Sequence, residues 1–468
     1  MTTMNSQTAK QPLQKSSPPQ KSSFSQKLIA LVAFALITSA FSAVARWRAA
    51  AHSKPSLYPV SAMPSFAQQQ QSREQTMRFL VRRVESDPQD MSASNMLAGI
   101  YIQKVRDTGS LDYMVRAEHL AHTSLASVPA VRNTAAVAVL TQVELMEHRW
   151  TAAAAHARLL ARLNAGQGYP YGLLGDALIE NGDYGGATSA YLAEARLGGG
   201  VGTEARLARL AFLRGRLGEA RRHYANALSF ARAENVPSPE SIAWCRWQLG
   251  ETAFYAGDYP AAEREYRAAL DMFPQYYLAL ASLGRVLAAR GDLPAATRAY
   301  EQAINVIPSP VYVGALGDLY RLTGRSQDAA AQYALVARIQ RLSKLGGELY
   351  NRQYALFYAD HGLNPQGAYR EAVQEYAVYS DIYGADAVAW TALKAGKTAV
   401  ARARIKEALR LGTQDAMLFY HAGMIARAAG DTAGAKAYLG QALALNPQFD
   451  PLQSRIARQA LAGLTAKG

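Results

Sequence analysis

Residues 243–276 read AWCRWQLGETAFYAGDYPAAEREYRAALDMFPQY, and residues 277–310 read YLALASLGRVLAARGDLPAATRAYEQAINVIPSP. The second stretch repeats the pattern of the first after a period of 34 residues. The repeated positions are Leu249-Gly250 with Leu283-Gly284, Gly257-Asp258 with Gly291-Asp292, Tyr266 with Tyr300, Ala269 with Ala303, and Pro274 with Pro308. A fixed period of this length indicates a stacked array of small structural units.

Each copy is predicted to form two helices that pack as a hairpin. Apolar residues recur at helical spacing on two segments. Gly257 stands where the first helix must end, because the residue just past a helix end often adopts the left-handed conformation. Pro274 ends the second helix, and the small Gly250 lets the two helices approach closely. One hairpin cannot bury its apolar face alone, so the pattern predicts neighbours on both sides.

These residues match a known repeat signature: the Leu-Gly pair, the small residue Ala262, the aromatic Tyr266 and the final Pro274. The chain therefore resembles the tetratricopeptide repeat (TPR) family. The resemblance implies an all-α fold, a right-handed superhelical α-solenoid of about ten TPR helix hairpins with N- and C-terminal capping helices. We expect the N-terminal capping helix at 71–90, the repeats at 91–449 and the C-terminal capping helix at 450–468. The unit at about 134–167 is the weakest match, since His148 stands where Gly is expected.

The N-terminal region has a different composition from the rest of the chain. A basic lead without acidic residues precedes the uncharged run Leu28 to Ala45, which ends in the small residues Ala43-Val44-Ala45. This order predicts a secretory signal cut after Ala45. An uncleaved membrane anchor at 28–45 is the alternative, because a run of 18 residues is just long enough to span a bilayer. Either interpretation places the repeats outside the cytoplasm, in a periplasmic or extracellular compartment, with 46–70 as a flexible linker.

The positive charge is concentrated before the repeats. The formal net charge is +14, but residues 1–73 contain eight basic residues and no acidic one. The remaining residues carry 42 basic and 36 acidic side chains, without a basic run. A phosphate-binding surface for nucleic acid is therefore disfavoured.

Several short motifs resemble catalytic or ligand-binding chemistry, but none has the required context. Gly396-Lys397-Thr398 lacks the earlier Gly and the preceding strand of a phosphate loop. Residues 200–205 lack the strand that precedes a dinucleotide fingerprint. His119 and His122 have no third ligand at a suitable spacing, and the single cysteine, Cys245, excludes an internal disulfide framework. We therefore expect a protein without catalytic activity, cofactor or metal.

Function is then expected to reside in surfaces. The resemblance implies that one face of each first helix lines a concave groove that holds partner peptides or helices. The candidate partner-binding residues on this face are Trp244, Trp247, Glu251, Phe254, Arg285, Arg321, Arg352 and Trp390. Aromatic residues and Arg dominate binding energy at protein interfaces. The alternative for Trp244 and Phe254 is that they pack against neighbouring repeats.

The sequence thus predicts an exported or membrane-tethered, non-enzymatic scaffold or adaptor that binds a protein partner. Fold alone does not determine function, and this prediction rests partly on family resemblance. An envelope carbohydrate-binding or carbohydrate-processing protein is the main alternative, which paired catalytic carboxylates in the groove would favour. A regulatory anchor facing the cytoplasm is a third and less favoured option.

Overall fold

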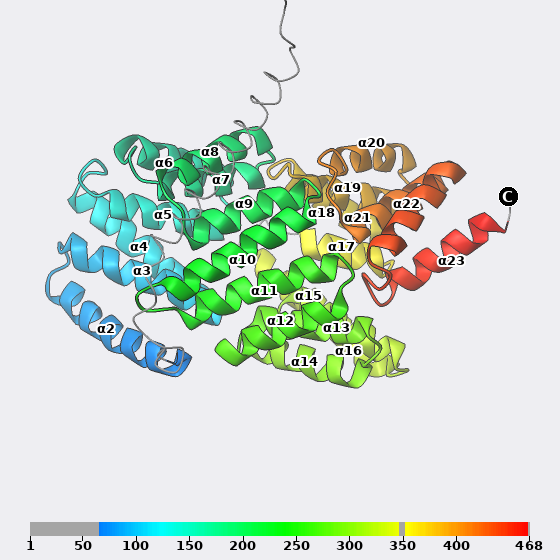
Figure 1. The fold of residues 1–468 in the computed structure, drawn as a ribbon, viewed down its shortest axis with the longest axis horizontal. Helices are drawn as coiled ribbons and strands as arrows, with labels where there is room; N and C mark the ends of the chain where they lie inside the picture. The colour runs from blue at the N-terminus through cyan, green and yellow to red at the C-terminus, as the bar shows by residue number, and fades with distance from the viewer. Residues whose placement is uncertain (1–64, 346–351, 467–468) are drawn as a thin grey trace, which may run out of the picture. The chain divides into compact units, whose positions relative to one another are not determined.

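The computed structural model describes residues 65–345 and 352–466, all within one structural unit, and over these residues the chain forms 22 helices and no strand (Figure 1). The predicted signal or anchor at Leu28 to Ala45 lies outside the described residues. Among the helices that are described, none has the length and apolar character needed to cross a membrane.

Ten helical hairpins follow one another along the described chain. They are α3 (Met91–Thr108) with α4 (Leu111–Ser127), α5 (Thr134–Met146) with α6 (Trp150–Leu163), α7 (Tyr169–Glu180) with α8 (Tyr184–Leu197), α9 (Val201–Leu213) with α10 (Leu217–Ala233), α11 (Pro239–Tyr255) with α12 (Tyr259–Met272), α13 (Tyr277–Ala289) with α14 (Leu293–Val306), α15 (Pro310–Leu322) with α16 (Ser326–Leu345), α17 (Arg352–Asp360) with α18 (Pro365–Tyr376), α19 (Ile382–Lys394) with α20 (Thr398–Ala408), and α21 (Ala416–Ala428) with α22 (Thr432–Leu445). The all-α solenoid predicted from the repeat is confirmed.

The repeated sequence explains the geometry of each hairpin. Gly257 has φ +74°, in the left-handed region that ends the first helix. Asp258 then caps α12, because its side chain accepts a hydrogen bond from the Ala261 N–H at 3.1 Å. A Cβ at Gly284 would lie only 2.8 Å from the Tyr300 ring of the same hairpin, so a small residue is required there. His148 also adopts a left-handed conformation, with φ +60°, although it is not a glycine.

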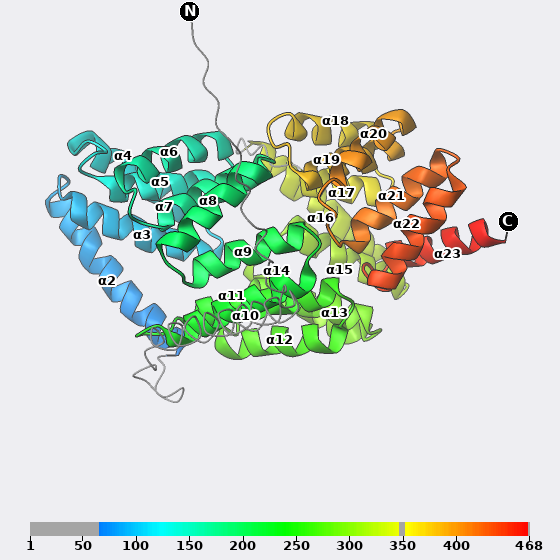
Figure 2. The same cartoon turned by 45° about the horizontal axis from the view of Figure 1, so that its top comes forward.

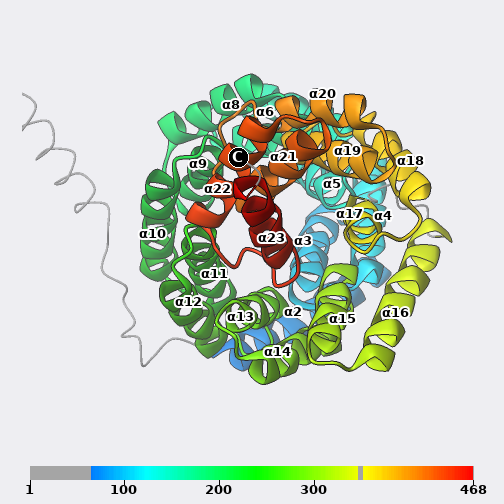
Figure 3. The same cartoon turned by 90° about the vertical axis from the view of Figure 1, so that its right-hand side faces the viewer.

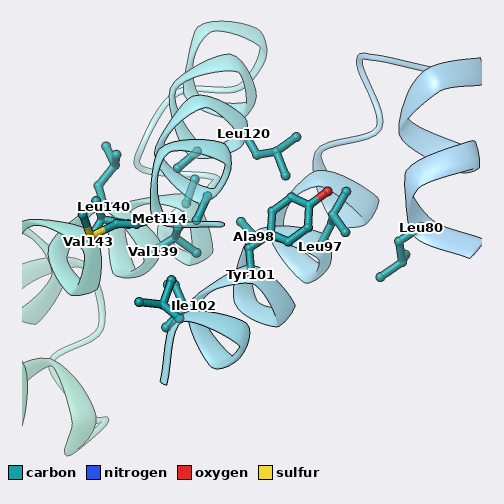
Figure 4. Close-up of a cluster of buried hydrophobic side chains, with 14 of the residues drawn as sticks. Leu80, Leu97, Ala98, Tyr101, Ile102, Met114, Leu120, Val139, Leu140 and Val143 are labelled. Atoms are coloured by element: carbon teal, nitrogen blue, oxygen red, sulfur yellow. The ribbon is translucent and has the colours of Figure 1, made fainter. Parts of the chain in front are cut away.

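The N-terminal helix α2 (Phe66–Ser86) begins earlier than the predicted 71–90, inside the segment predicted to be linker. The reason is local, since the Ser65 side chain and Gln68 form a capping box that starts the helix. Leu80 of α2 joins the apolar core of the first hairpins, which Figure 4 shows in close-up. At its other end Phe66 stacks on Phe273, with ring centroids 3.8 Å apart. Helix α2 therefore links the first hairpin to the fifth.

The hairpins wind around a common axis, with α11, α13 and α15 on the inside of the ring and α10, α14 and α16 on the outside (Figure 3). Successive turns of this coil touch directly, along a line of contacts that we call the seam (Figure 2). Its hydrogen bonds join residues 187 to 200 positions apart in sequence: Ser380 Oγ to Asn181 O (3.1 Å), Ile382 N to Tyr184 Oη (2.9 Å), Thr413 Oγ1 to Leu213 O (2.5 Å), Asn446 Nδ2 to Phe254 O (2.7 Å), Tyr259 Oη to Asn446 Oδ1 (2.6 Å) and Gln448 N to Tyr259 Oη (2.9 Å). Hairpins three to five are thus bonded to segments that flank hairpins nine and ten.

The seam uses the same glycines that end the first helices. A Cβ at Gly182, Gly215 or Gly257 would collide with a backbone carbonyl of Ser380, Gly412 or Leu445, respectively. The absence of a side chain at these positions therefore permits both the left-handed turn and the close contact between coil turns. The array is consequently not a one-dimensional stack in which each repeat contacts only its neighbours.

The C-terminal helix α23 (Gln453–Thr465) covers the last hairpin and, viewed along the coil axis, lies over the centre of the ring (Figure 3). Gln453 accepts a hydrogen bond from the Tyr420 hydroxyl at 2.7 Å. Asp450 accepts hydrogen bonds from the backbone N–H groups of Leu452 and Gln453, at 2.8 and 2.7 Å. This turn brings Phe449–Pro451 to the inside of the coil.

Candidate binding site on the inner face

On the inner face, carboxylates of three hairpins each form an ion pair with a residue of the following hairpin. Glu251, which directly follows the close-contact Gly250, accepts a hydrogen bond from Tyr266 Oη at 2.7 Å. Arg285 of the next hairpin donates to both oxygens of Glu251, at 2.6 and 2.7 Å. Burial, together with the nearby charge of Glu251, raises the pKa of Tyr266 well above its usual range, so this hydroxyl stays protonated and acts as a donor.

The same arrangement recurs in two other hairpins. Asp176 accepts from Tyr191 Oη at 3.0 Å and pairs with Arg206 at 2.8 Å. Asp318 accepts from Tyr333 Oη at 2.6 Å and pairs with His361 at 2.7 Å. The sequence reveals the carboxylates that follow Gly175, Gly250 and Gly317, but not the residue of the following hairpin that pairs with each.

Two of the predicted partner-binding residues are buried, and this is a correction to the sequence prediction. Trp390 is 0% exposed, and its Nε1 donates to Asp360 Oδ1 at 2.8 Å while its ring stacks on His421. Phe254 is 3% exposed, and the Arg285 guanidinium lies 4.0 Å from the centre of its ring. Both aromatics pack within the fold and present no surface to a partner here.

The other predicted residues differ in their exposure and in the contacts that they make within the fold. Trp247 is half-buried, and its Nε1 donates to Ser282 Oγ at 2.9 Å. Arg352 pairs with Asp381 at 2.9 Å and with Glu375 at 3.1 Å. Arg321 is exposed, and Trp244 lines a cavity described next. The assignment of these residues to partner binding stays a prediction.

Two cavities open on the inner face. Cavity 1, of about 650 Å³, is bounded chiefly by α3, α7, α9, α11 and the start of α13. Four aromatic rings line it, those of Tyr224, Trp244, Tyr276 and Tyr277, together with the charged residues Arg106, Asp176, Arg206, Arg209 and Glu240. Most of this charge is neutralised internally, since Arg206 pairs with Asp176 and Glu194, and Arg209 pairs with Glu180.

Cavity 2, of about 480 Å³, is enclosed by parts of the chain that are distant in sequence. Its walls come from α13, α15, α17, the Met417 side chain of α21 and the segment Phe449–Pro451. Apolar residues form much of the lining, and Arg285, Asp318, Arg352, Asp360, His361 and Asp450 supply the charge. Burial, with contributions from Asp318 and Asp360, raises the pKa of Asp450 to about 7.

The comparisons with known proteins bear on the repeat. Family models for the tetratricopeptide repeat match residues 202–275, 248–311 and 388–448. The chain contains tetratricopeptide repeats over these residues. No curated protein matches its sequence.

Two solved structures resemble this TPR protein at low sequence identity. The crystal structure of MamA is 22% identical with a TM-score of 0.30, and the match covers 36% of this chain and 96% of MamA. The structure of the human IFIT1 dimer with PPP-AAAA is 13% identical with a TM-score of 0.45, covering 74% of this chain and 79% of the other. TPR units generally mediate protein–protein interactions without catalysis, so a protein is the expected class of partner.

Several cavity residues of the TPR protein were missed by the sequence analysis. Asp360, His361 and Asp450 lie at or just beyond the ends of helices rather than at the groove positions of first helices. Tyr276 and Tyr277 occupy the junction between two repeats, which the sequence marks only as a boundary. Reasoning from the faces of helices does not find such residues, because the winding of the hairpins brings helix ends and linkers to the inner face.

The remaining sequence motifs of the TPR protein lie where turns and surfaces were expected. Gly396 has φ +76° between α19 and α20. His119 and His122 are both exposed on α4. Cys245 is fully buried, and burial raises its pKa to about 12, so the thiol is protonated and unreactive. Within residues 65–345 and 352–466, no three His, Cys, Asp or Glu side chains form a group that could hold a metal ion.

Proposed function

We propose that this TPR protein is a non-enzymatic scaffold that holds a segment of a partner protein on the inner face of its coil. The observation that supports this most is the presence of two cavities on that face, lined by the first helices of the hairpins. Their volumes lie in the range of about 300–1,000 Å³ that is typical of ligand pockets. Aromatic and arginine side chains, which dominate interface energies, contribute to both linings.

We further propose that the TPR unit acts outside the cytoplasm, either after cleavage behind Ala45 or while anchored by residues 28–45. The basic lead and the uncharged run at Leu28 to Ala45 support this proposal. N-terminal sequencing of protein from its native host should then begin at Arg46. A chain that begins near Met1 and stays with membranes after a carbonate wash would establish the anchor, and a chain that begins near Met1 in the soluble cytoplasmic fraction would refute both.

Partner capture tests the scaffold function. Tagged full-length protein and its Tyr277→Ala variant would be expressed in the native host, and captured proteins compared by quantitative mass spectrometry. Tyr277 lines cavity 1 and makes no described side-chain hydrogen bond, so its loss should reduce binding more than stability. A hot-spot truncation costs about 2 kcal/mol, or about thirtyfold in affinity.

The control for this experiment is Leu192→Ala, which removes a side chain that is 46% exposed on α8, a second helix. Captured proteins that fall in abundance with Tyr277→Ala but not with Leu192→Ala, at matched melting temperatures, are candidate partners. Equal capture by both variants would place the binding surface elsewhere and refute the inner-face assignment.

The contacts of the carboxylates in cavity 2 disfavour the carbohydrate-processing alternative. It requires carboxyl groups free to act as acid and as base or nucleophile, and cavity 2 does contain three carboxylates. Each of them has a partner in the fold: Asp318 binds Tyr333 and His361, Asp360 binds the Trp390 indole, and Asp450 binds two backbone N–H groups. These hydrogen bonds favour a structural and binding role.

A further inference from the structure

The size of the cavities limits what a partner can insert. An α-helix with side chains is about 10 Å wide and rises about 5.4 Å per turn, so one turn occupies roughly 420 Å³. An extended residue at sheet packing distances occupies roughly 155 Å³. Cavity 2, at about 480 Å³, therefore holds about one helical turn or three extended residues. A short extended segment matches this volume better than a whole helix does.

The walls of cavity 2 come from both turns of the coil. Arg285 and Asp318 belong to hairpins six and seven, whereas Met417 and Phe449–Pro451 follow more than ninety residues later. The seam holds the two turns together through Tyr259, Asn446 and Gln448, only a few residues before Phe449. Cavity 2 is therefore a partly open site whose walls are held in place by the seam.

The charge of cavity 2 is unbalanced. Its two arginines are committed to other carboxylates, Arg285 to Glu251 and Arg352 to Glu375 and Asp381. His361 pairs with Asp318. Among the described side chains, neither Asp360 nor Asp450 forms an ion pair, and both line the cavity. Lys394 and His421 lie near Asp360 and compensate its charge in part. The charge of cavity 1 is more nearly balanced, because its lining contains the exposed Arg106 as well as Glu240.

We propose that cavity 2 accepts a lysine or arginine side chain carried by an extended segment of the partner protein. This inference rests on the scaffold function proposed above and specifies the chemistry of the partner. The apolar walls, among them Leu356, Phe357 and Phe449, contact the aliphatic stem of the basic side chain. The charged head is placed among Asp318, Asp360 and Asp450, where low solvent access strengthens the attraction.

Peptide binding to the full-length protein tests this proposal. Three fluorescently labelled hexapeptides are used, with alternating Ala-Lys, Ala-Gln or Ala-Glu sequences, and affinity is measured by fluorescence anisotropy at pH 8 in 150 mM salt. The Ala-Lys peptide should bind at least about tenfold more tightly than the Ala-Gln peptide, and the Ala-Glu peptide should bind least. Failure of the Ala-Lys peptide to bind at millimolar concentration, or a preference for Ala-Glu, would overturn the proposal.

Two variants locate the binding to cavity 2. Asp360→Asn removes one charge while keeping an acceptor for the Trp390 indole. Val311→Lys adds a positive charge at a cavity side chain that is 55% exposed, without breaking any described hydrogen bond. Both should weaken Ala-Lys binding about tenfold, whereas Asp271→Asn on the exposed surface of α12 should leave it unchanged. Equal effects of Asp271→Asn and Val311→Lys would mean nonspecific attraction and refute the site.

The two proposals fail in different ways. If Tyr277→Ala abolishes partner capture while Val311→Lys changes neither partner capture nor peptide binding, the scaffold function stands and the basic-segment inference is wrong. If neither variant changes partner capture, the inner face is not the binding surface and the scaffold function itself is refuted.

Discussion

Two groups of hairpin turns have the same sequence signature and the same backbone conformation, yet they meet different surroundings. Gly182, Gly215 and Gly257 have φ between +70° and +75° and abut backbone carbonyls of the next coil turn. Gly396 and Gly430 have φ +76° and +78° and have open space where a Cβ would lie. The repeat therefore specifies the shape of each turn, whereas the path of the whole coil decides what the turn contacts.

This comparison changes how stability is distributed along the array. A stack with contacts only between neighbours responds to damage locally. The seam adds bonds between hairpins that are far apart in sequence, and several of them are buried, as shown by Thr413 at 1% and Asn446 at 2% exposure. Hairpins three to five should therefore unfold together with the C-terminal hairpins.

The largest expected difference is between Gly215→Ala and Gly396→Ala. Both variants place a side chain in the left-handed region, which costs about 1–2 kcal/mol. Only Gly215→Ala also drives a Cβ into the Gly412 carbonyl, and overpacking of that kind typically costs about 1–3 kcal/mol more. Urea unfolding should show the larger loss for Gly215→Ala. Equal losses would mean that the seam does not form in solution.

Gly284→Leu separates damage within a hairpin from damage to the seam. The larger side chain meets the Tyr300 ring and should cost about 1–3 kcal/mol. Hydrogen exchange should quicken first at 243–343. It should then quicken at 445–448, which are bonded to hairpin five through Phe254 and Tyr259, before it quickens at 91–127. Exchange that spreads only to sequence neighbours would contradict the role of the seam.

Asn446→Ala removes one seam residue without altering any helix. The variant removes one hydrogen bond to the Phe254 carbonyl and the acceptor of the Tyr259 hydroxyl, which keep their bonds from the Gly257 and Gln448 N–H groups. A lost hydrogen bond typically costs about 0.5–1.5 kcal/mol, so the variant should lose about 1–3 kcal/mol in all. Asn305→Ala, at an exposed position of α14, is the matched control and should be within about 0.5 kcal/mol of wild type. Thermal unfolding of both variants is the measurement, and similar midpoints would count against the seam.

The last expected effect is on the pH dependence of stability. An unfolded Asp titrates near 4, whereas burial raises the pKa of Asp450 to about 7 and that of Asp415 to about 6. The folded protein therefore holds protons that the unfolded chain releases, so these groups reduce stability as pH rises from about 4 to about 7. As pH rises from about 4 to about 7, the melting temperature of Asp450→Asn should rise relative to that of wild type. The melting temperature of Asp271→Asn should not change relative to wild type. A constant difference between Asp450→Asn and wild type across that range would contradict the raised pKa.

Sequence reasoning found the parts of the molecule that depend on local interactions. The left-handed Gly257, the close contact at Gly284 and the helix boundaries around them follow from conformational preferences and steric size, which act over a few residues. His148 illustrates the limit of this approach, since it weakened the match to the repeat although its backbone still adopts the expected turn.

The candidate site was predicted less completely. Trp244 and Arg285 of the predicted face line cavities 1 and 2, and their role in partner binding stays a prediction. Burial of Phe254 was the alternative given for that residue, whereas burial of Trp390 was not considered. Helical spacing alone does not distinguish a side chain that faces a groove from one that the next hairpin covers.

The sequence by itself determined the helices, their pairing into hairpins and their order, because each depends on residues within one period of the repeat. The tertiary structure alone decided the seam, cavity 2 and the placement of Asp360 and Asp450 in its wall. These features depend on the small rotation from each hairpin to the next. Summed over about six hairpins, that rotation brings residues nearly 200 positions apart into contact.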